Sequence, residues 1–504
     1  MTARWLPSTV QPAAQNELPS QRELSRQVNP MPYQTVTFED GTTEEYDTEA
    51  LSAGAEGEIF RSRSGKHLVK LYFSRPGYDA ERMQRIKTLI NDVNPTKNAP
   101  YWEEYFSWPE KLVIRPRIGF RMRFAQGLRT VDNFFFRTYY ERVLKPDERG
   151  WFIGRVAAAI KIVNAANRLS SSGLCYPDFS DKNIMVDAYD GRMTLIDCDS
   201  ITVPGRISPT VQGTSWYRAP ELVKGSLTIP NVRSDRHALA VILYLWLLRW
   251  HPLNGDKVHD SRDPDRDEEL RLGERALYIE HPTDRSNRAQ GQPYSARILG
   301  NEMSELFRRA FVEGLFDPGR RPQPAEWQEA LWHLYDRVIP CPTPSCDWHS
   351  YVAAPTRGLA CPCCNQRIKQ PTNLPFLYLM RHKGSSNADD FQMDLMRAHY
   401  VVGWPERTLN AWHFKPNASS LPPAPDQMPD IAAKAAFDYD PHKDQWYITN
   451  LALPEARSSG PGGSAGVWRT WPVNSSLPLV NGMLLQGGPG TEYFRIKVHI
   501  AQVA

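Results

Sequence analysis

The chain reads Tyr176-Pro177-Asp178-Phe179-Ser180-Asp181-Lys182-Asn183 and, a little further on, Asp197-Cys198-Asp199. Between these segments, Ile184-Met185-Val186 and Met193-Thr194-Leu195-Ile196 flank Asp190-Gly191, which predicts a β-hairpin closed by a turn. The segment Gly213-Thr214-Ser215-Trp216-Tyr217-Arg218-Ala219-Pro220-Glu221 follows. Short β-like runs precede this region, and helical periodicity dominates around it. The order is therefore a strand-rich lobe followed by a helix-rich lobe that contains one hairpin.

The strand and helix predictions come from hydrophobic periodicity. Strands are expected at 35–38, 58–60, 67–73, 111–114 and 120–124. Helices are expected at 78–90, along a stripe from Val156 to Asn167 that Gly173 ends, and at 237–249, 301–313 and 324–337.

Two features of the strand-rich lobe are weak signals when taken alone. Gly54 and Gly57 lie in a loop between predicted strands, where glycine lets backbone amides approach phosphate oxygens. A plain glycine turn is the commoner explanation of such a loop. Lys70 follows in an apolar strand, where an outward-facing charge is the usual explanation.

In order and spacing, these segments together resemble the protein-kinase motif set: glycine loop, strand lysine, catalytic loop with Asn, Asp-Phe-Gly and Ala-Pro-Glu. Ser234-Asp235-Arg236 and Asp317-Pro318-Gly319-Arg320-Arg321-Pro322 extend the resemblance, which covers about residues 36–338. It implies an α+β, bilobal protein-kinase fold. It also implies an enzyme that needs ATP and Mg²⁺ or Mn²⁺ and acts on a protein substrate.

The resemblance assigns nucleotide-binding roles in the first lobe. The backbone around Gly54 and Gly57 would cover the ATP phosphates, and Lys70 would hold the α- and β-phosphates. An acid on the following helix would pair with Lys70. Glu81 is the preferred candidate for this acid, and Asp79 is its rival.

The resemblance also assigns catalytic roles in the second lobe. Asp178 would orient the substrate hydroxyl and accept its proton, because phosphoryl transfer depends mainly on positioning and charge neutralisation. Asn183 and Asp197 would bind Mg²⁺ through oxygen, which this hard cation prefers. Lys182 would supply a further positive charge near Asp178. In a structural role, Glu221 would pair with Arg321.

Two departures from the family pattern bear on activity. Tyr176-Pro177 replaces His-Arg, so the arginine that usually binds a phosphorylated activation loop is missing, which indicates activity independent of such phosphorylation. Asp199 replaces the last glycine of Asp-Phe-Gly and would restrict its flips. Retention of Lys70, Asp178, Asn183 and Asp197 nevertheless favours an active kinase over the alternative, a pseudokinase or ATP-binding scaffold.

The substrate platform resembles the Ser/Thr version, Gly213-Thr214-x-x-Tyr217-x-Ala219-Pro220-Glu221, which disfavours a small-molecule or lipid kinase. With Trp108-Pro109 and His251-Pro252-Leu253-Asn254-Gly255, it is similar to a bacterial branch of Ser/Thr kinases. That branch includes the kinase of the tellurium-resistance-associated phosphorylation triad. The resemblance implies a type-2C protein phosphatase and a von Willebrand A-domain protein as candidate partners.

Five of the seven cysteines lie between Cys341 and Cys364. Two cysteine pairs separated by a loop can place four thiolates tetrahedrally around structural Zn²⁺. The predicted ligands are Cys341, Cys346, Cys361 and Cys364, with Cys363 as a spare and His349 as a possible substitute. Unliganded thiols in a linker remain the alternative.

After about Pro375, short β-like runs alternate with turn residues, which predicts an antiparallel sandwich. The segments 445–452 and 477–488 resemble the second half of a forkhead-associated (FHA) domain, and 458–466 is expected to be a flexible loop. The arginine and the Ser-Arg pair with which that family binds phosphothreonine are not matched, and Lys434 and Arg407 are the nearest cations. The segment is therefore expected to bind a protein partner or its own kinase domain without phosphothreonine.

Composition sets the remaining limits. The 504 residues carry 60 basic and 57 acidic side chains, a net charge of +3. This balance gives no reason to expect nucleic acid as a partner. The longest apolar run, 238–248, is too short to span a membrane, and we expect a cytoplasmic protein.

The predicted organisation is a disordered lead-in (1–35), a kinase N-lobe (36–125), a C-lobe (126–338), a zinc-knuckle linker (339–370) and an FHA-like β-sandwich (371–504).

Overall fold

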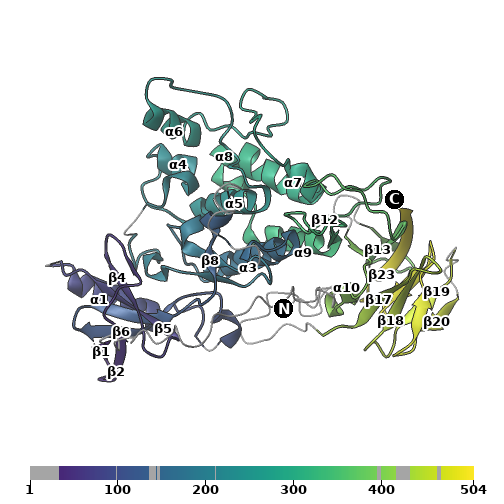
Figure 1. Ribbon diagram of the computed structural model, residues 1–504, viewed down its shortest axis with the longest axis horizontal. Helices are drawn as coiled ribbons and strands as arrows, with labels where there is room; N and C mark the ends of the chain where they lie inside the picture. Colours follow the sequence, from purple (N-terminus) through teal and green to yellow (C-terminus); the bar gives the residue numbers. More distant parts are fainter. Residues whose placement is uncertain are drawn as a thin grey trace, which may run out of the picture.

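The computed structural model describes residues 33–75, 77–97, 99–135, 144, 148–209, 212–393, 399–415, 432–461 and 467–504. The lead-in predicted for residues 1–35 lies outside this range except for its last three residues, which begin the first strand. Figure 1 shows two lobes followed by a C-terminal group of strands that lies beside the second lobe.

The first lobe is a seven-stranded antiparallel sheet with the order β2-β1-β6-β7-β5-β4-β3. Its strands are β1 (Tyr33–Phe38), β2 (Thr43–Asp47), β3 (Ser52–Ala53), β4 (Gly57–Arg61), β5 (His67–Tyr72), β6 (Pro109–Arg115) and β7 (Gly119–Arg123). β5 lies between β4 and β7, and its last four side chains are buried. α1 (Asp79–Asn91) follows β5 and packs against β6. The strands predicted in this lobe are all present.

The second lobe is mainly helical. Its helices are α3 (Phe152–Ser171), α4 (Pro220–Val223), α5 (Val232–Leu248), α6 (Pro264–Leu272), α7 (Asn301–Arg308), α8 (Gly314–Phe316) and α9 (Pro324–Arg337). The predicted helix over 301–313 is α7 continued by a π-helical turn at Arg309–Glu313.

α5 is the central helix of this lobe, and it explains the longest apolar run of the sequence. Asn231 begins it with a capping box shared with Ser234, and every residue from His237 to Leu248 is buried. Because the helix is surrounded by protein on all sides, it needs no polar face. In the part of the chain that the structure describes, no helix has the length and apolar character needed to cross a bilayer.

The predicted hairpin consists of β9 (Ile184–Val186) and β10 (Met193–Leu195), which form a small sheet with β8 (Arg129–Thr130). Backbone hydrogen bonds from Leu195 N to Tyr105 O and from Ser107 N to Leu195 O attach β10 to the segment between α1 and β6 of the first lobe. The hairpin therefore fixes both acidic segments relative to the first lobe.

The residues after α9 begin with a two-stranded sheet, β11 (Val338–Pro340) and β12 (Ser350–Val352). Two antiparallel sheets follow, with the orders β14-β13-β23-β22-β19-β20, extended by β15 on β13, and β16-β17-β18-β21. Their elements are β13 (Asn373–His382), β14 (Phe391–Gln392), β15 (Tyr400–Val402), β16 (Thr408–Leu409), α10 (Ala411–Phe414), β17 (Ala435–Asp440), β18 (Gln445–Asn450), β19 (Arg457–Ser459), β20 (Trp468–Thr470), β21 (Ser476–Pro478), β22 (Leu484–Gln486) and β23 (Arg495–Gln502).

The loop predicted for 458–466 needs a correction, because Ser458 and Ser459 belong to β19 and pair with both β20 and β22. Residues 462–466 lie outside the described range. The pairing partners come from positions further along the chain, which the local Ser/Gly composition could not reveal.

One hydrophobic core runs from the helical lobe into the C-terminal sheets, whereas a smaller cluster of seven residues fills the outer part of the first lobe. α9 packs against β15, and Figure 1 shows the C-terminal strands next to α9 and α10. The C-terminal sheets are therefore continuous with the helical lobe.

Candidate active site

Lys70 lies on β5 with 8% of its surface exposed. Its Nζ donates to Asp197 Oδ1 at 2.6 Å and to Asp199 Oδ2 and Oδ1 at 2.8 and 2.9 Å. Burial disfavours the ammonium, but the two carboxylates outweigh burial and raise the pKa of Lys70. Lys70 is therefore a charged group held by two acids from one segment.

The two acids differ in environment. The side chain of Asp197 is 38% exposed and that of Asp199 is 5% exposed. Asp199 Oδ2 also accepts from the Tyr72 hydroxyl at 2.6 Å. Burial opposes ionisation of Asp199, yet Lys70 and Tyr72 outweigh it and hold the pKa of Asp199 below its usual value. The nearby Asp199 charge, together with burial, raises the pKa of Asp197 to about 6.

The backbone at Asp197 is in the left-handed region, with φ 53° and ψ 37°. Such a conformation is costly for a residue with a Cβ and persists where the surroundings fix it. Ser200 does so by donating to Asp197 O from its N and Oγ, at 3.1 and 2.9 Å. On the preceding side, Ile196 N donates to Asn183 O at 3.0 Å, and Ile196 O accepts from the Tyr176 hydroxyl.

Asp178 lies in the loop after α3 and is partly buried. Its Oδ2 accepts from Asn183 Nδ2 at 2.7 Å, and its Oδ1 accepts from Thr214 Oγ1 at 2.8 Å and from Thr214 N at 3.1 Å. Because the amide nitrogen of Asn183 faces Asp178, its amide oxygen is the atom available to a cation. The carboxylate is therefore oriented from both sides by residues of two different segments.

Gly213 allows the segment of Thr214 to approach this loop. It has φ +87°, and a Cβ there would lie 2.4 Å from Pro177 O. Both facts require glycine at this position.

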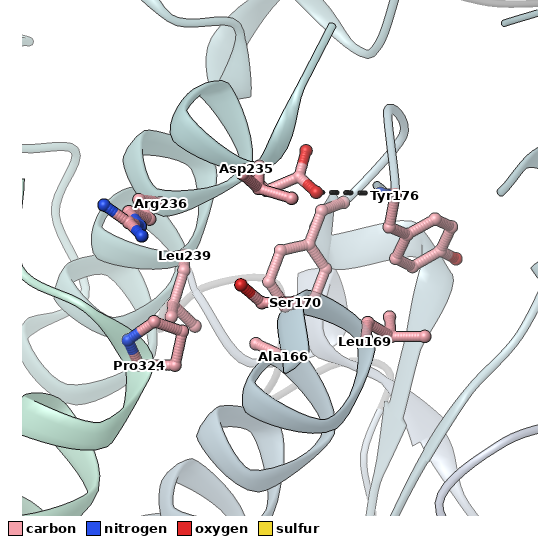
Figure 2. A pocket seen from close by; sticks show the side chains of 10 residues that line it. Ala166, Leu169, Ser170, Tyr176, Asp235, Arg236, Leu239 and Pro324 are labelled. Atoms are coloured by element: carbon pink, nitrogen blue, oxygen red, sulfur yellow. Dashed lines mark hydrogen bonds between the residues drawn. The ribbon is translucent and has the colours of Figure 1, made fainter. Parts of the chain in front are cut away.

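Asp235 at the start of α5 accepts hydrogen bonds from the residues that precede Asp178 in its loop. Its Oδ2 accepts from Tyr176 N at 2.8 Å and its Oδ1 from Cys175 Sγ at 3.3 Å. Burial raises the pKa of Asp235 to about 7. Figure 2 shows this contact beside a small pocket lined by α3, α5 and Pro324. The sequence signal for Asp235 was the quoted Ser234-Asp235-Arg236, but its contact was not predicted.

The predicted pair of Glu221 and Arg321 is confirmed. Arg321 Nη1 and Nη2 each donate to one carboxylate oxygen of Glu221 at 2.7 Å. Arg321 is fully buried and also donates to Gly314 O, Leu315 O and Arg233 O. This pair holds the segment that ends at Glu221 against the helical lobe.

The glycine loop forms the turn between β3 and β4, closed by Gly54 N donating to Gly57 O at 2.9 Å. A Cβ at Gly54 would meet no atom within 4 Å, whereas a Cβ at Gly57 would lie 2.4 Å from Leu71 O. Gly57 is thus required by the approach of β5. Lys182 is exposed in the turn Asp181–Asn183.

The expected pairing of Lys70 with Glu81 needs a correction. Glu81 lies on the exposed face of α1, and Asp79 lies at its first turn, while Lys70 pairs with Asp197 and Asp199. Asp199 contacts Lys70 instead. In the sequence, Asp199 was noted only as a replacement of the last glycine of Asp-Phe-Gly. No single-sequence signal distinguished it from a solvent-facing substitution.

α1 contacts the same segment through a cation, Arg85. Its Nε donates to Asp199 O at 2.7 Å, its Nη2 to Ile201 O at 2.8 Å and its Nη1 to Ser208 O at 2.7 Å. Arg85 of α1 therefore binds the backbone of the segment that contains Asp199, and the Asp199 side chain binds Lys70.

The four predicted zinc ligands come together. The sulfurs of Cys341, Cys346, Cys361 and Cys364 all lie within 4.8 Å of one another, with 3.5 Å between Cys341 and Cys364 and 3.7 Å between Cys346 and Cys361. Four sulfurs at ~2.3 Å from a tetrahedral Zn²⁺ are ~3.8 Å apart. The donor set therefore fits a structural zinc ion.

The residues around these cysteines cap α3. Trp348 O accepts from Phe152 N at 2.8 Å, and Ser350 Oγ accepts from Ile153 N at 3.0 Å. The rings of Trp348 and Phe152 stack with centroids 4.6 Å apart. The segment predicted as a linker thus satisfies amide groups that a helix N-terminus leaves unpaired.

A second polar cluster joins α9 to the C-terminal sheets, and we call it the seam: Asp336, His399, Arg407 and His413. Asp336 Oδ2 accepts from His399 Nε2 at 2.7 Å, and His413 Nε2 lies 3.2 Å from Asp336 Oδ1. Arg407 donates to Asp336 O, Val338 O and Val402 O.

The carboxylate and two imidazoles of the seam are close enough to hold a metal ion. However, His413 Nδ1 accepts from Asn410 N at 2.8 Å, so its Nε2 carries the proton and donates to Asp336. A metal-bound histidine normally donates from its other nitrogen. The seam is therefore a hydrogen-bonded contact.

Comparison with known proteins identifies one domain. Residues 140–329 match the family model of the protein kinase domain. This range is less than half of the chain. It includes Asp178, Asn183 and Asp197, whereas Lys70 and the cysteine cluster lie outside it. A comparison with curated proteins found no match.

Proposed function

We propose that this chain is an active Ser/Thr protein kinase that transfers the γ-phosphate of ATP to protein hydroxyls. The kinase-domain match supports phosphotransferase activity. The observation that carries the proposal is the orientation of Asp178 by Asn183 and Thr214, close to a segment whose Asp197 contacts Lys70. These are the groups that phosphoryl transfer requires, and they come from four separate segments.

In the proposed reaction, Asp178 accepts a hydrogen bond from the substrate hydroxyl and takes its proton. The hydroxyl oxygen forms the new bond to the γ-phosphorus, and the bond from that phosphorus to the bridging oxygen breaks, which leaves ADP. Lys70 would hold the α- and β-phosphates, and the backbone at Gly54 and Gly57 would cover them. Lys182, which is exposed and follows Asp178 by four residues, would add positive charge near the transferring group.

Mg²⁺ or Mn²⁺ would neutralise charge on the phosphate oxygens. The donor set fits such an ion, because Asn183 offers an amide oxygen and Asp197 offers a carboxylate that is 38% exposed. Asp197 must then exchange at least part of its contact with Lys70 for the cation.

The Ser/Thr assignment rests on Thr214, whose hydroxyl and amide both donate to Asp178. A pseudokinase is not favoured, since each group needed for transfer is present. A kinase for small molecules or lipids is disfavoured by the same platform.

The test is transfer of labelled γ-phosphate from Mg-ATP to the chain itself and to a generic protein substrate, followed by phosphoamino-acid analysis. We expect phosphoserine or phosphothreonine, and Lys70→Ala should lower the rate by at least ~10²-fold. A wild-type protein that neither binds ATP nor transfers phosphate would contradict the proposal, and phosphotyrosine alone would contradict its specificity.

We also propose that the four clustered cysteines hold one structural Zn²⁺, which the sulfur separations support. Elemental analysis of protein prepared without chelator should find about one zinc per chain. Absence of zinc would favour the alternative, unliganded thiols.

For the C-terminal sheets we propose an FHA-like interaction module that does not need phosphothreonine. Arg407, one of the two nearest candidate cations, is 4% exposed and donates to α9, so it is directed away from a ligand in solvent. The contact with α9 supports docking on its own kinase domain. Micromolar, phosphate-dependent binding of phosphothreonine peptides to the full chain would overturn this proposal.

The narrower resemblance leads us to propose a cytoplasmic bacterial protein that works with a type-2C phosphatase and a von Willebrand A-domain protein. Co-purification with such partners from a cell that encodes them is the direct test.

A further inference from the structure

We infer that Asp199 is the positioning residue for Lys70 and takes the place of an acid on α1. This inference rests on the proposed kinase function and concerns how its lysine is held. The Lys70 ammonium lies between Asp197, which is 38% exposed, and Asp199, which is 5% exposed. A cation at Asp197 would compete for the exposed acid, whereas the buried acid keeps its contact with Lys70.

The geometry of Asp199 is that of a fixed support. Both of its carboxylate oxygens lie within 3 Å of Lys70 Nζ, at 2.9 and 2.8 Å, and the Tyr72 hydroxyl donates to one of them at 2.6 Å. Lys70 and Tyr72 are two positions apart on β5 and therefore face the same side of the sheet. The strand thus offers two donors to one carboxylate, which sets the direction of the lysine side chain.

The backbone of Asp199 is fixed as well. Its carbonyl accepts from Arg85 Nε on α1 at 2.7 Å, and Arg85 also donates to Ile201 O and Ser208 O. α1 therefore acts on Lys70 indirectly. Arg85 of α1 binds the backbone of the segment that contains Asp199, and the carboxylate of Asp199 binds Lys70 on β5. Glu81 lies on the exposed face of the same helix.

This arrangement predicts which acid matters. In Asp199→Asn, the charge that positions Lys70 is lost and the shape is retained. We expect kcat to fall by at least ~30-fold with a smaller change in KM for ATP, since a displacement of about 1 Å can cost ~10²-fold. Asp199→Glu should restore part of the rate, because the carboxylate returns at a shifted position. Glu81→Gln should change kcat by less than about threefold.

Two further measurements separate positioning from other roles. Tyr72→Phe removes one donor to Asp199 and should lower kcat modestly, so it tests the inference even if Asp199→Asn folds poorly. ADP affinity without divalent cation reports Lys70 directly, and we expect Asp199→Asn to weaken it while Glu81→Gln leaves it nearly unchanged.

The outcomes are distinguishable. Loss of activity in Glu81→Gln with near-normal Asp199→Asn would overturn the inference and leave the kinase proposal intact. A large rise in the Mg²⁺ concentration needed for half-maximal rate in Asp199→Asn, with unchanged ADP affinity, would make Asp199 a metal ligand and also overturn it. An inactive wild type, or an unaffected Lys70→Ala, would instead refute the proposed function.

Discussion

The candidate active-site cluster (Lys70, Asp178, Asn183, Asp197 and Asp199) and the seam are both built from polar groups that lie far apart in the chain. They differ in how much of their side chains is exposed to solvent. Asp197 keeps 38% of its side chain exposed, whereas Asp336 and His413 are 8% and 3% exposed. The proposed transfer of Asp197 from Lys70 to a cation would need an acid that solvent can reach. A buried cluster that joins two parts of a fold is instead stabilising when all of its polar groups have hydrogen-bond partners.

The largest expected effect concerns the cysteine segment, which follows α9 and caps the N-terminus of α3. Removal of zinc, or Cys361→Ser, should lower the free energy of unfolding on the order of 5 kcal/mol or more, because structural zinc binding is coupled to folding. Chemical denaturation with and without chelator measures it. The matched control is Cys363→Ser, which removes the spare thiol and should keep both zinc and stability.

The next prediction tests whether the active-site cluster acts in chemistry. Asp178→Asn retains the shape of the side chain but cannot accept a proton, so the transfer rate should fall by ~10³-fold, or about 4 kcal/mol in activation free energy. Melting temperature and ATP affinity should stay close to wild type. The exposed Asp265→Asn serves as the control, and equal activity of the two variants would remove Asp178 from the mechanism.

The third prediction tests whether the seam acts only in stability. Arg407→Met would leave three backbone carbonyls without their donor and should lower the free energy of unfolding by about 3 kcal/mol. The kcat of the folded fraction should change little. The exposed Arg469→Met is the control. If Arg407→Met instead abolished transfer without destabilising the protein, the two clusters would not be separate in role.

The smallest expected effect is a pH dependence of the seam. Burial, together with His333, lowers the pKa of His399 to about 3, against the donation to Asp336. The unfolded chain then binds more protons than the folded one between about pH 3 and 6.5, so stability rises with pH across that window.

Acidification from pH 7 to 4.5 should therefore lower the free energy of unfolding by about 2.5 kcal/mol through this histidine. His399→Gln cannot be protonated, and its melting temperature should fall less over the same range than that of wild type. Identical slopes for the two proteins would exclude His399 as the source.

Much of the first cluster could be predicted, because its residues sit at family spacings in the chain. The motif spacing predicted that Asp178, Asn183 and Asp197 lie on one loop and hairpin, where the structure places them, and the spacing of the cysteine pairs predicted the four sulfurs that lie together. The exception is the acid for Lys70. A search along the following helix suggested Glu81, but whether a helix side chain faces a strand lysine depends on the rotation of that helix against the sheet.

The seam could not be predicted, because His399, Arg407 and His413 follow no motif and the acceptor that they share, Asp336, lies on α9. Their pairing depends on how the C-terminal sheets dock, and that contact is set by packing of a shared apolar core. In the sequence, Arg407 was noted only as one of the two cations nearest to the unmatched phosphothreonine-binding positions.

By itself, the sequence determined the order of lobes, the hairpin between the acidic segments, the buried central helix and the cluster of four cysteines. These follow from periodicity and spacing, which are local properties of a chain. Only the tertiary structure decided that Asp199 rather than Glu81 holds Lys70, that Gly57 and Gly213 are required by close backbone approach, and that Arg407 faces α9. Those outcomes depend on how separate segments of the chain are placed relative to one another. The partners of Lys70 and of Arg407 lie more than 60 residues away from them in the sequence, and local propensity carries no information about that placement.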